Sequence, residues 1–269
     1  MKESSRPTSL SAAATSQRST TMSNHKLLAL FVLAALPTLF WCQTPSADII
    51  NVTAGSDTHI TSNEATTNFS GAATLRTRGL STITRATFVQ FTLPADTKLV
   101  VNEVVLTLAG ASTITVDALV EVLATTTAID FATVTWTSAL GGLITGPTGR
   151  DTDYTVLWNP AVWANTGQLW NINGMTTNNT VTYTDATAAD GLLKFINDNY
   201  NGTSAVTFTI GLGLAPDVTA SGADFRSLES AAQYAKPSLQ LTFTAIPEPV
   251  SFGLLLVGLL PMSTRRRRR

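Results

Sequence analysis

The chain has 269 residues, of which 13% are charged and 44% are hydrophobic. All of its 18 acidic residues except Glu3 and Glu248 fall within residues 48–245, whereas nine of its 17 basic residues fall outside, so this segment has a net charge of −8. An acidic segment does not favour phosphate backbones, so we expect no nucleic-acid partner. The only cysteine, Cys42, precedes the segment, which excludes disulfides, a thiol nucleophile and cysteine metal sites within it.

Residues 1–47 are expected to be a leader that contains a secretory signal peptide. Residues 27–42 read LLALFVLAALPTLFWC, with Lys26 before them and the small residues of TPSAD after them. A positive flank, a short apolar core and small residues behind it are typical of such a signal. A membrane anchor would need roughly 20 apolar residues, so the sequence favours export over anchoring at this end.

Residues 48–245 are long enough for one domain, and their dominant pattern is a period of two. Apolar residues alternate with polar ones in ATFVQFTL, NEVVLTLA, TITVDALVEV, SAVTFTIGL and PSLQLTFT. Such alternation predicts half-buried strands with polar outer faces, as in two packed antiparallel sheets. We expect Phe91, Leu106, Val120, Phe208 and Leu241 to lie in the core.

One segment has a helical period instead. After Asp185, a suitable N-terminal cap, apolar residues recur at Ala189, Leu192, Leu193, Ile196 and Tyr200. Gly202 lies just beyond the expected end. Strands before and after one short helix predict an all-β fold, a jelly-roll β-sandwich.

A stretch rich in aromatic residues lies between the strands. Tyr154, Trp158, Trp163 and Trp170 fall within DYTVLWNPAVWANTGQLW, with Asn and Gly between them. Flat rings can stack on sugar faces, so Tyr154, Trp158 and Trp163 are candidate carbohydrate-binding residues. The alternative is that these rings belong to the core. Trp136 is expected in the core as part of a strand.

Few residues of the segment suit catalysis or metal binding. His59 is its only histidine, no serine nucleophile accompanies it, and we expect it to be a strand residue facing water. No His/Cys zinc cluster and no phosphate-binding loop is present in the sequence. Asp151 and Asp153 lie in a turn-rich stretch that suits either a solvated loop or a structural calcium site. A carboxylate pair for glycoside hydrolysis remains open, since such pairs meet in space.

Several short stretches occur in the order typical of the DNRLRE-type domain. They are Asp57; Asn68, Phe69 and Gly71; residues 85–91; Thr135 and Trp136; Phe225, Ser227 and Glu229; and Lys236, Pro237 and Leu239. The segment thus resembles that family over nearly its whole length, apart from an extra Ser70 and the Trp-rich stretch. The resemblance implies a β-jelly-roll module of secreted and surface proteins, some of which bind carbohydrate, and it does not imply catalysis. From the residues alone, Glu229 is expected to pair with Arg226 or Arg85.

Residues 246–269 read IPEPVSFGLLLVGLLPMSTRRRRR. The apolar run of residues 250–262 is short for a spanning helix, and a following basic cluster holds such a run on the cytoplasmic side during export. Pro247, Glu248 and Pro249, the apolar run, and Arg265, Arg266, Arg267, Arg268 and Arg269 together resemble the PEP-CTERM sorting signal. That resemblance implies a bacterial host, transient attachment to the inner membrane, and cleavage by an exosortase-type processing enzyme. A plain tail anchor is the alternative.

The sequence therefore predicts an exported, non-catalytic module of the cell envelope surface or extracellular matrix. Its expected ligand is an extracellular polysaccharide. Two other hypotheses stay open: a polysaccharide-degrading enzyme on the same fold, and a structural matrix protein without a small ligand.

Overall fold

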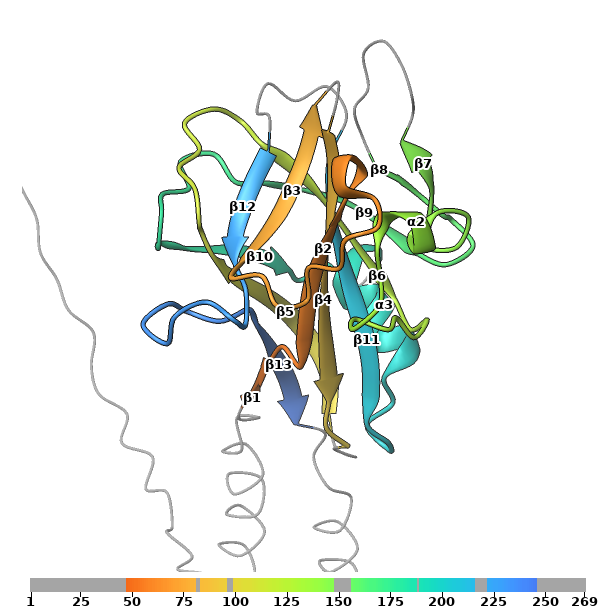
Figure 1. Cartoon of the computed structure of the whole chain (residues 1–269). Coiled ribbons are helices and arrows are strands. Elements are labelled where there is room, and N and C mark those ends of the chain that lie inside the picture. Colours follow the sequence, from red (N-terminus) through yellow and green to blue (C-terminus); the bar gives the residue numbers. More distant parts are fainter. Residues whose placement is uncertain are drawn as a thin grey trace, which may run out of the picture. The chain divides into compact units, whose positions relative to one another are not determined.

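The computed structural model describes residues 47–80, 83–95, 99–147, 156–187, 189–215 and 222–245 (Figure 1). The expected signal peptide and the expected sorting signal lie outside these residues. None of the helices in the described ranges has the length and apolarity needed to span a bilayer.

Four strands form the first sheet, and each pairs antiparallel with its neighbours. In sheet order they are β1 (Ala47–Thr53), β13 (Ser238–Ala245), β5 (Leu99–Ala109) and β10 (Thr180–Asp185). The first and last strands of the domain are therefore neighbours at one side of this sheet.

The second sheet has seven strands, also antiparallel. Its main path is β12 (Gly222–Arg226), β3 (Thr74–Leu80), β4 (Ile83–Leu93), β11 (Val206–Leu214), β6 (Leu119–Thr125) and β9 (Ala164–Asn171), while β2 (Ser56–Thr61) pairs with β4. The short 3-10 helix η1 (Ser62–Glu64) follows β2, and β7 (Ile144–Pro147) with β8 (Val156–Trp158) makes a separate pair. Figure 1 shows β2, β3 and β12 on the near face of the molecule.

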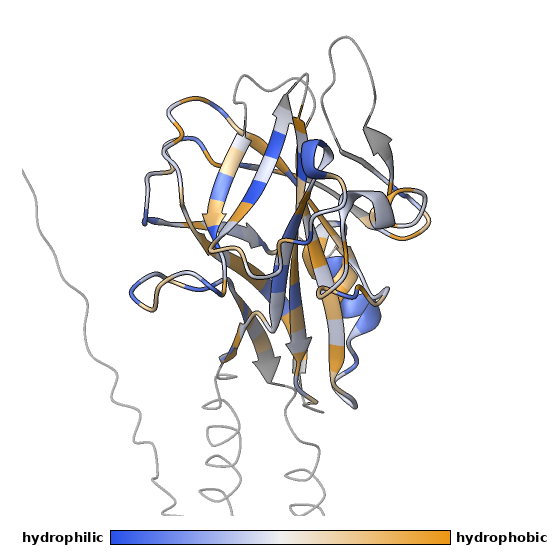
Figure 2. Ribbon diagram, in the orientation of Figure 1, coloured by the Kyte–Doolittle hydropathy of each residue, from blue (hydrophilic) through white to orange (hydrophobic). Residues whose placement is uncertain are grey.

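The main core lies between the two sheets, and the predicted β-sandwich is confirmed. Alternate residues of β4, β5, β6, β11 and β13 point into it, and in Figure 2 β11 is mostly coloured as hydrophobic. The five residues expected in the core are all fully or almost fully buried there: Phe91, Leu106, Val120, Phe208 and Leu241.

One predicted strand is shorter than its pattern suggested. Alternation predicts a strand over residues 113–122, but β6 begins only at Leu119. Ile114 and Ala118 are buried in the loop before it, whereas Val116, expected on the same face, is exposed. The backbone of Ile114 is held by Met175 and Gly174 rather than by a neighbouring strand.

The described residues form two α-helices, one of which was predicted. Helix α3 (Gly191–Asn199) buries Leu192, Leu193 and Ile196 against the main core. Asp185 caps it from a distance, since its carboxylate accepts a hydrogen bond from the backbone N–H of Leu193 at 2.9 Å. The short helix α2 (Trp136–Ala139) replaces the strand expected around Trp136, because Thr135 and Ser138 form a reciprocal capping box. Trp136 itself is buried, as predicted.

A second core covers the opposite face of the seven-stranded sheet. Ile60, Ala86, Phe88 and Leu123 project from that face and pack against the segment that runs from Ile129 through α2 to Trp163. Figure 1 shows α2, β7 and β8 together at this side of the sandwich. The described parts of the connection between β6 and β9 are therefore packed against the sheet.

Candidate functional site

The two tryptophans expected to present rings to a glycan belong to this second core. Trp163 is 2% exposed, stacks on Phe88 with a centroid distance of 5.7 Å, and donates from Nε1 to the carbonyl of Leu143 at 2.7 Å. Trp158 is half-buried, lies edge-on to Trp163 at 4.9 Å, and donates from Nε1 to Oε2 of Glu121 at 3.0 Å. Burial raises the pKa of Glu121, and the hydrogen bond from the indole opposes this shift.

Two glycines of β11 make room for these rings. A Cβ atom on Gly211 would lie 2.8 Å from the ring of Trp163, and a Cβ atom on Gly213 would lie 2.9 Å from the ring of Trp158. Both distances are shorter than real carbon contacts, so the indoles rest directly on the strand backbone. The sequence contained a signal for this packing, Gly-Leu-Gly within a predicted strand, because a glycine inside a strand often marks a place where another group approaches the backbone closely.

The expected presentation of the tryptophans is therefore corrected at one position. Trp163 cannot stack on a sugar from where it lies, because its ring is enclosed by Phe88, Trp158 and the strand backbone. Trp158 keeps part of its surface in contact with solvent. Tyr154, and the candidate calcium ligands Asp151 and Asp153, lie outside the described residues.

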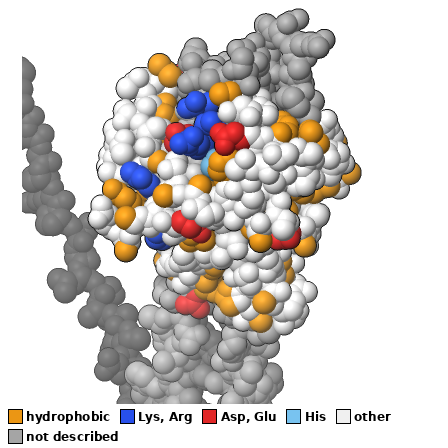
Figure 3. Space-filling model, in the orientation of Figure 1, with side chains coloured by type: hydrophobic (Ala, Val, Ile, Leu, Met, Phe, Trp, Pro, Cys, Tyr) orange, Lys and Arg blue, Asp and Glu red, His pale blue; other side chains and the backbone are white. Residues whose placement is uncertain are grey.

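A different group of polar residues gathers at the near face of the molecule. Arg76 and Arg78 come from β3, Arg85 from β4 and His59 from β2, with Phe69 in the loop between β2 and β3; we call these five residues the arginine face. Register places Arg78 opposite Arg85 and His59 opposite Thr87. Figure 3 shows Lys and Arg side chains close together here, with acidic side chains beside them and a histidine next to them.

Phe69 covers His59. Their rings stack with centroids 4.4 Å apart and an interplanar angle of 24°. Asn68 fixes this loop, because its side-chain amide donates to the carbonyls of Phe131 and Val134 and its oxygen accepts from Ser70. The prediction that His59 faces water is wrong, since its side chain is only 3% exposed. Burial first, and then the charges of Arg76 and Arg85, lower the pKa of His59 to about 4, so it is neutral at pH 7.

Among the described residues, no acidic side chain lies within hydrogen-bonding distance of the arginine face. Arg85 is 6% exposed; its Nε donates to Thr61 at 3.2 Å, but its Nη1 has no partner. Nε of Arg78 and Nδ1 of His59 are also buried without one. Among the described side chains, no carboxylate forms an ion pair with Arg76, Arg78 or Arg85. Burial, followed by repulsion from Arg76 and Arg78, lowers the pKa of Arg85.

Two carboxylates lie near this face without reaching ion-pair distance. Asp224 of β12 pairs in register with Arg76, and Glu64 ends η1. Their charges act in the opposite sense on the pKa of Arg85, but they are weaker causes than burial and the neighbouring arginines. Among the described groups, positive charge therefore prevails at this face, whereas residues 48–245 as a whole are acidic.

The same side of β2 also holds the loop that follows β12. Oδ2 of Asp57 accepts the backbone N–H of Leu228 at 2.8 Å, and Lys236 donates to the carbonyls of Leu228 and Ser230. Burial raises the pKa of Asp57 to about 7, with a further upward contribution from Glu229. The predicted pairing of Glu229 with Arg226 or Arg85 is wrong: between these described residues there is no ion pair.

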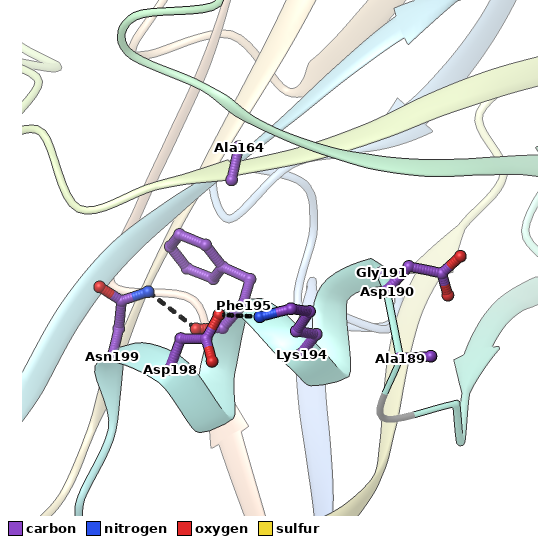
Figure 4. Close-up of a pocket in the computed structure, with 8 residues that line it drawn as sticks. All are labelled: Ala164, Ala189, Asp190, Gly191, Lys194, Phe195, Asp198 and Asn199. Atoms are coloured by element: carbon purple, nitrogen blue, oxygen red, sulfur yellow. Dashed lines mark hydrogen bonds and ion pairs between the residues drawn. The ribbon is translucent and has the colours of Figure 1, made fainter.

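A shallow pocket of about 480 Å³ lies between α3 and β9 (Figure 4). The ammonium group of Lys194 contacts Asp198 at 2.5 Å within the same helix, and the amide of Asn199 donates to the carbonyl of Phe195. Its lysine is thus neutralised locally, so the pocket offers a ligand less unpaired charge than the arginine face. Within the described residues, no group of three or more His, Cys, Asp or Glu side chains is placed to hold a metal ion.

The arginine face was missed by reasoning from the sequence. Its signal was present, since the segment with a charge of −8 has only eight basic residues, and three of them, Arg76, Arg78 and Arg85, fall within ten consecutive residues. Comparison with known proteins adds no assignment: no protein-family model matches the chain, and a search of curated proteins finds no match.

Proposed function

We propose that the chain is an exported, non-catalytic module of the bacterial envelope or extracellular matrix, and that its arginine face binds polysaccharides that carry acidic groups. The observation that carries the proposal is the cluster of Arg76, Arg78 and Arg85, in which Arg76 is exposed, Arg85 is buried, and none forms an ion pair with a described side chain. A buried charge without a partner is costly, and a carboxylate or sulfate ester would supply charge-assisted hydrogen bonds.

The rest of the arginine face suits a polymer of sugar acids better than a polyanion without sugar rings. Phe69 adds flat apolar area next to the arginines, which a pyranose ring can cover. The net charge of −8 over residues 48–245 opposes non-specific attachment of long polyanions, so binding depends on local contacts. Export and sorting are supported by the leader pattern and by the resemblance of the tail to a PEP-CTERM signal, with an exosortase-type enzyme as the processing partner.

The arrangement of His59 favours binding over turnover. A general base must reach the proton that it removes, and His59 lies beneath Phe69. No metal or cofactor is part of the proposal, and a structural calcium ion at Asp151 and Asp153 stays a separate proposal.

Affinity electrophoresis tests the proposed ligand class. Gels would contain alginate or polygalacturonate as carboxylated polymers, and dextran as a neutral one. We expect retardation by the carboxylated polymers, its loss in the double variant Arg76→Gln/Arg78→Gln, and weaker retardation as salt is raised. Lys194→Gln is the control, because it removes a positive charge outside the arginine face, and it should keep the retardation. Lys236 is left unchanged, because it holds a loop.

The outcomes separate the three hypotheses. Retardation that both variants retain would place binding outside the arginine face. Release of new reducing or unsaturated ends would favour the degrading enzyme. If neither the charged nor the neutral polymers are bound, the hypothesis of a structural matrix protein would be favoured.

A further inference from the structure

The domain begins and ends at one end of the four-stranded sheet. Ala47, the first residue of β1, pairs with Thr244, and Ala245, the last residue of β13, pairs with Leu99. In Figure 1, β13 ends at the bottom of the view, whereas β3 and β12 occupy the upper part. The chain therefore leaves the domain at the end away from the arginine face.

Two large apolar side chains are exposed at this end. Ile49 of β1 is 55% exposed and Val100 of β5 is 52% exposed. Ile49 pairs with Thr242, whose hydroxyl donates to Glu103, and Val100 points away from its buried neighbour Val101. Single exposed apolar residues are common, so the exposure of these two indicates a role only because of where they lie.

Their position is next to the start of the apolar tail. Residues 246–249 separate Ala245 from the apolar run of residues 250–262. Four residues span at most about 14 Å, even fully extended. When the run is in a bilayer, this short span keeps Ala245 close to the lipid surface, which brings Ile49 and Val100 within reach of the headgroup region, where apolar side chains gain by partial burial.

We propose that Ile49 and Val100 form a membrane-facing contact that holds this end of the domain on the lipid surface while the tail is inserted. The contact rests on the proposed membrane association of the tail. It is apolar rather than electrostatic, because the charged groups described here, Asp48 and Glu103, are acidic and would be repelled by anionic lipid. It also points the arginine face away from the bilayer.

Site-specific fluorescence tests this contact in the full chain. In a Cys42→Ser background, single cysteines at Val100, Thr180 or Leu256 would carry the environment-sensitive label NBD. Thr180 is the matched control, because it is exposed on the edge of the same sheet and pairs with Ala109 at the opposite end of β5. The proteins would be reconstituted into phosphatidylcholine vesicles containing lipids with a spin-label quencher on the headgroup or on the acyl chain.

At position 100, we expect the NBD emission to shift to the blue and to be quenched by the headgroup spin label. At position 180, we expect no change. At position 256, we expect quenching by the acyl-chain spin label. Adding Ile49→Ser should reduce the shift at position 100. Quenching at 256 with none at 100 would overturn the contact while leaving tail insertion intact. Absence of quenching at 256 would overturn both, and equal quenching at 100 and 180 would show that the domain lies on the bilayer without this orientation.

Discussion

Two buried ionisable residues on β2, Asp57 and His59, are held toward their neutral forms. The pKa of Asp57 is raised to about 7, and that of His59 is lowered to about 4. At His59, the unfolded chain binds more protons than the folded chain between pH 4 and about 6.5. The contribution of His59 to the stability of the fold is therefore lost as pH falls through this window. For Asp57, the folded chain binds more protons between about pH 4 and 7, so its contribution is lost as pH rises.

Because these two slopes oppose each other, replacing Asp57 should expose the slope of His59. In Asp57→Asn, we expect the free energy of unfolding to rise by on the order of 3 kcal/mol between pH 4 and 6.5, the value of a shift of this size. Asparagine keeps an acceptor for the backbone N–H of Leu228. Urea unfolding at pH 4.5, 5.5 and 6.5 measures the slope.

The double variant Asp57→Asn/His59→Gln is the control for this slope. It removes both groups, so its pH profile should again be nearly flat over the same window. A flat profile in Asp57→Asn alone would show that the pKa of His59 is not lowered in the folded protein.

At the scale of elements, β11 is fitted to the tryptophans that lie on it. Gly213→Ala would place a Cβ atom 2.9 Å from Trp158, so we expect a cost of about 1–3 kcal/mol, the usual range for overpacking. Gly55→Ala is the control, because nothing lies within 4 Å of its Cβ position, and its stability should be almost unchanged. Chemical denaturation compares the two.

A rescue variant checks the cause of that cost. Trp158→Leu in the Gly213→Ala background should make the substitution of Gly213 much less harmful than it is beside Trp158, since the smaller side chain relieves the close contact. If Gly213→Ala costs the same in both backgrounds, the strain arises from the strand itself and not from the indole.

The strands were largely predictable, because burying one face of a sheet imposes a period of two on the sequence. Prediction failed where other interactions set the backbone, as at residues 113–118, where Met175 and Gly174 hold Ile114 in a loop. Helix α2 was too short for a periodic signal and depends on one capping box. The arginine face depends on which strands pair and in what register, and composition alone does not state that Arg78 lies opposite Arg85.

At the scale of the whole molecule, the two cores belong to one domain that shares the seven-stranded sheet. Phe208→Ala in the main core and Trp163→Ala in the second core should each cost about 3–5 kcal/mol, the usual range for a buried aromatic residue. Both variants should still unfold in a single transition when followed by circular dichroism and by tryptophan fluorescence. Two separated transitions in Trp163→Ala would show that the second core unfolds independently.

The processed protein should be shorter at both ends. If the leader and the tail are signals, material from the native host should lack residues 27–40 and Arg265 to Arg269. Intact-mass measurement decides this. Extracellular protein that retains the arginines would contradict the sorting signal, and expression without a processing enzyme should leave the full chain with the inner membrane.

The position of β13 bears on how the domain would respond to mechanical force. It lies between β1 and β5, with seven register pairs on one side and eight on the other, and it ends at Ala245. Hydrogen bonds between antiparallel strands run perpendicular to the strands. A pull along β13 from Ala245 therefore loads both ladders in shear, so that the bonds resist together instead of breaking one after another. If flow pulled on a polymer bound to the domain while the tail was held fixed, the force would act along β13, the direction in which its hydrogen bonds resist most strongly.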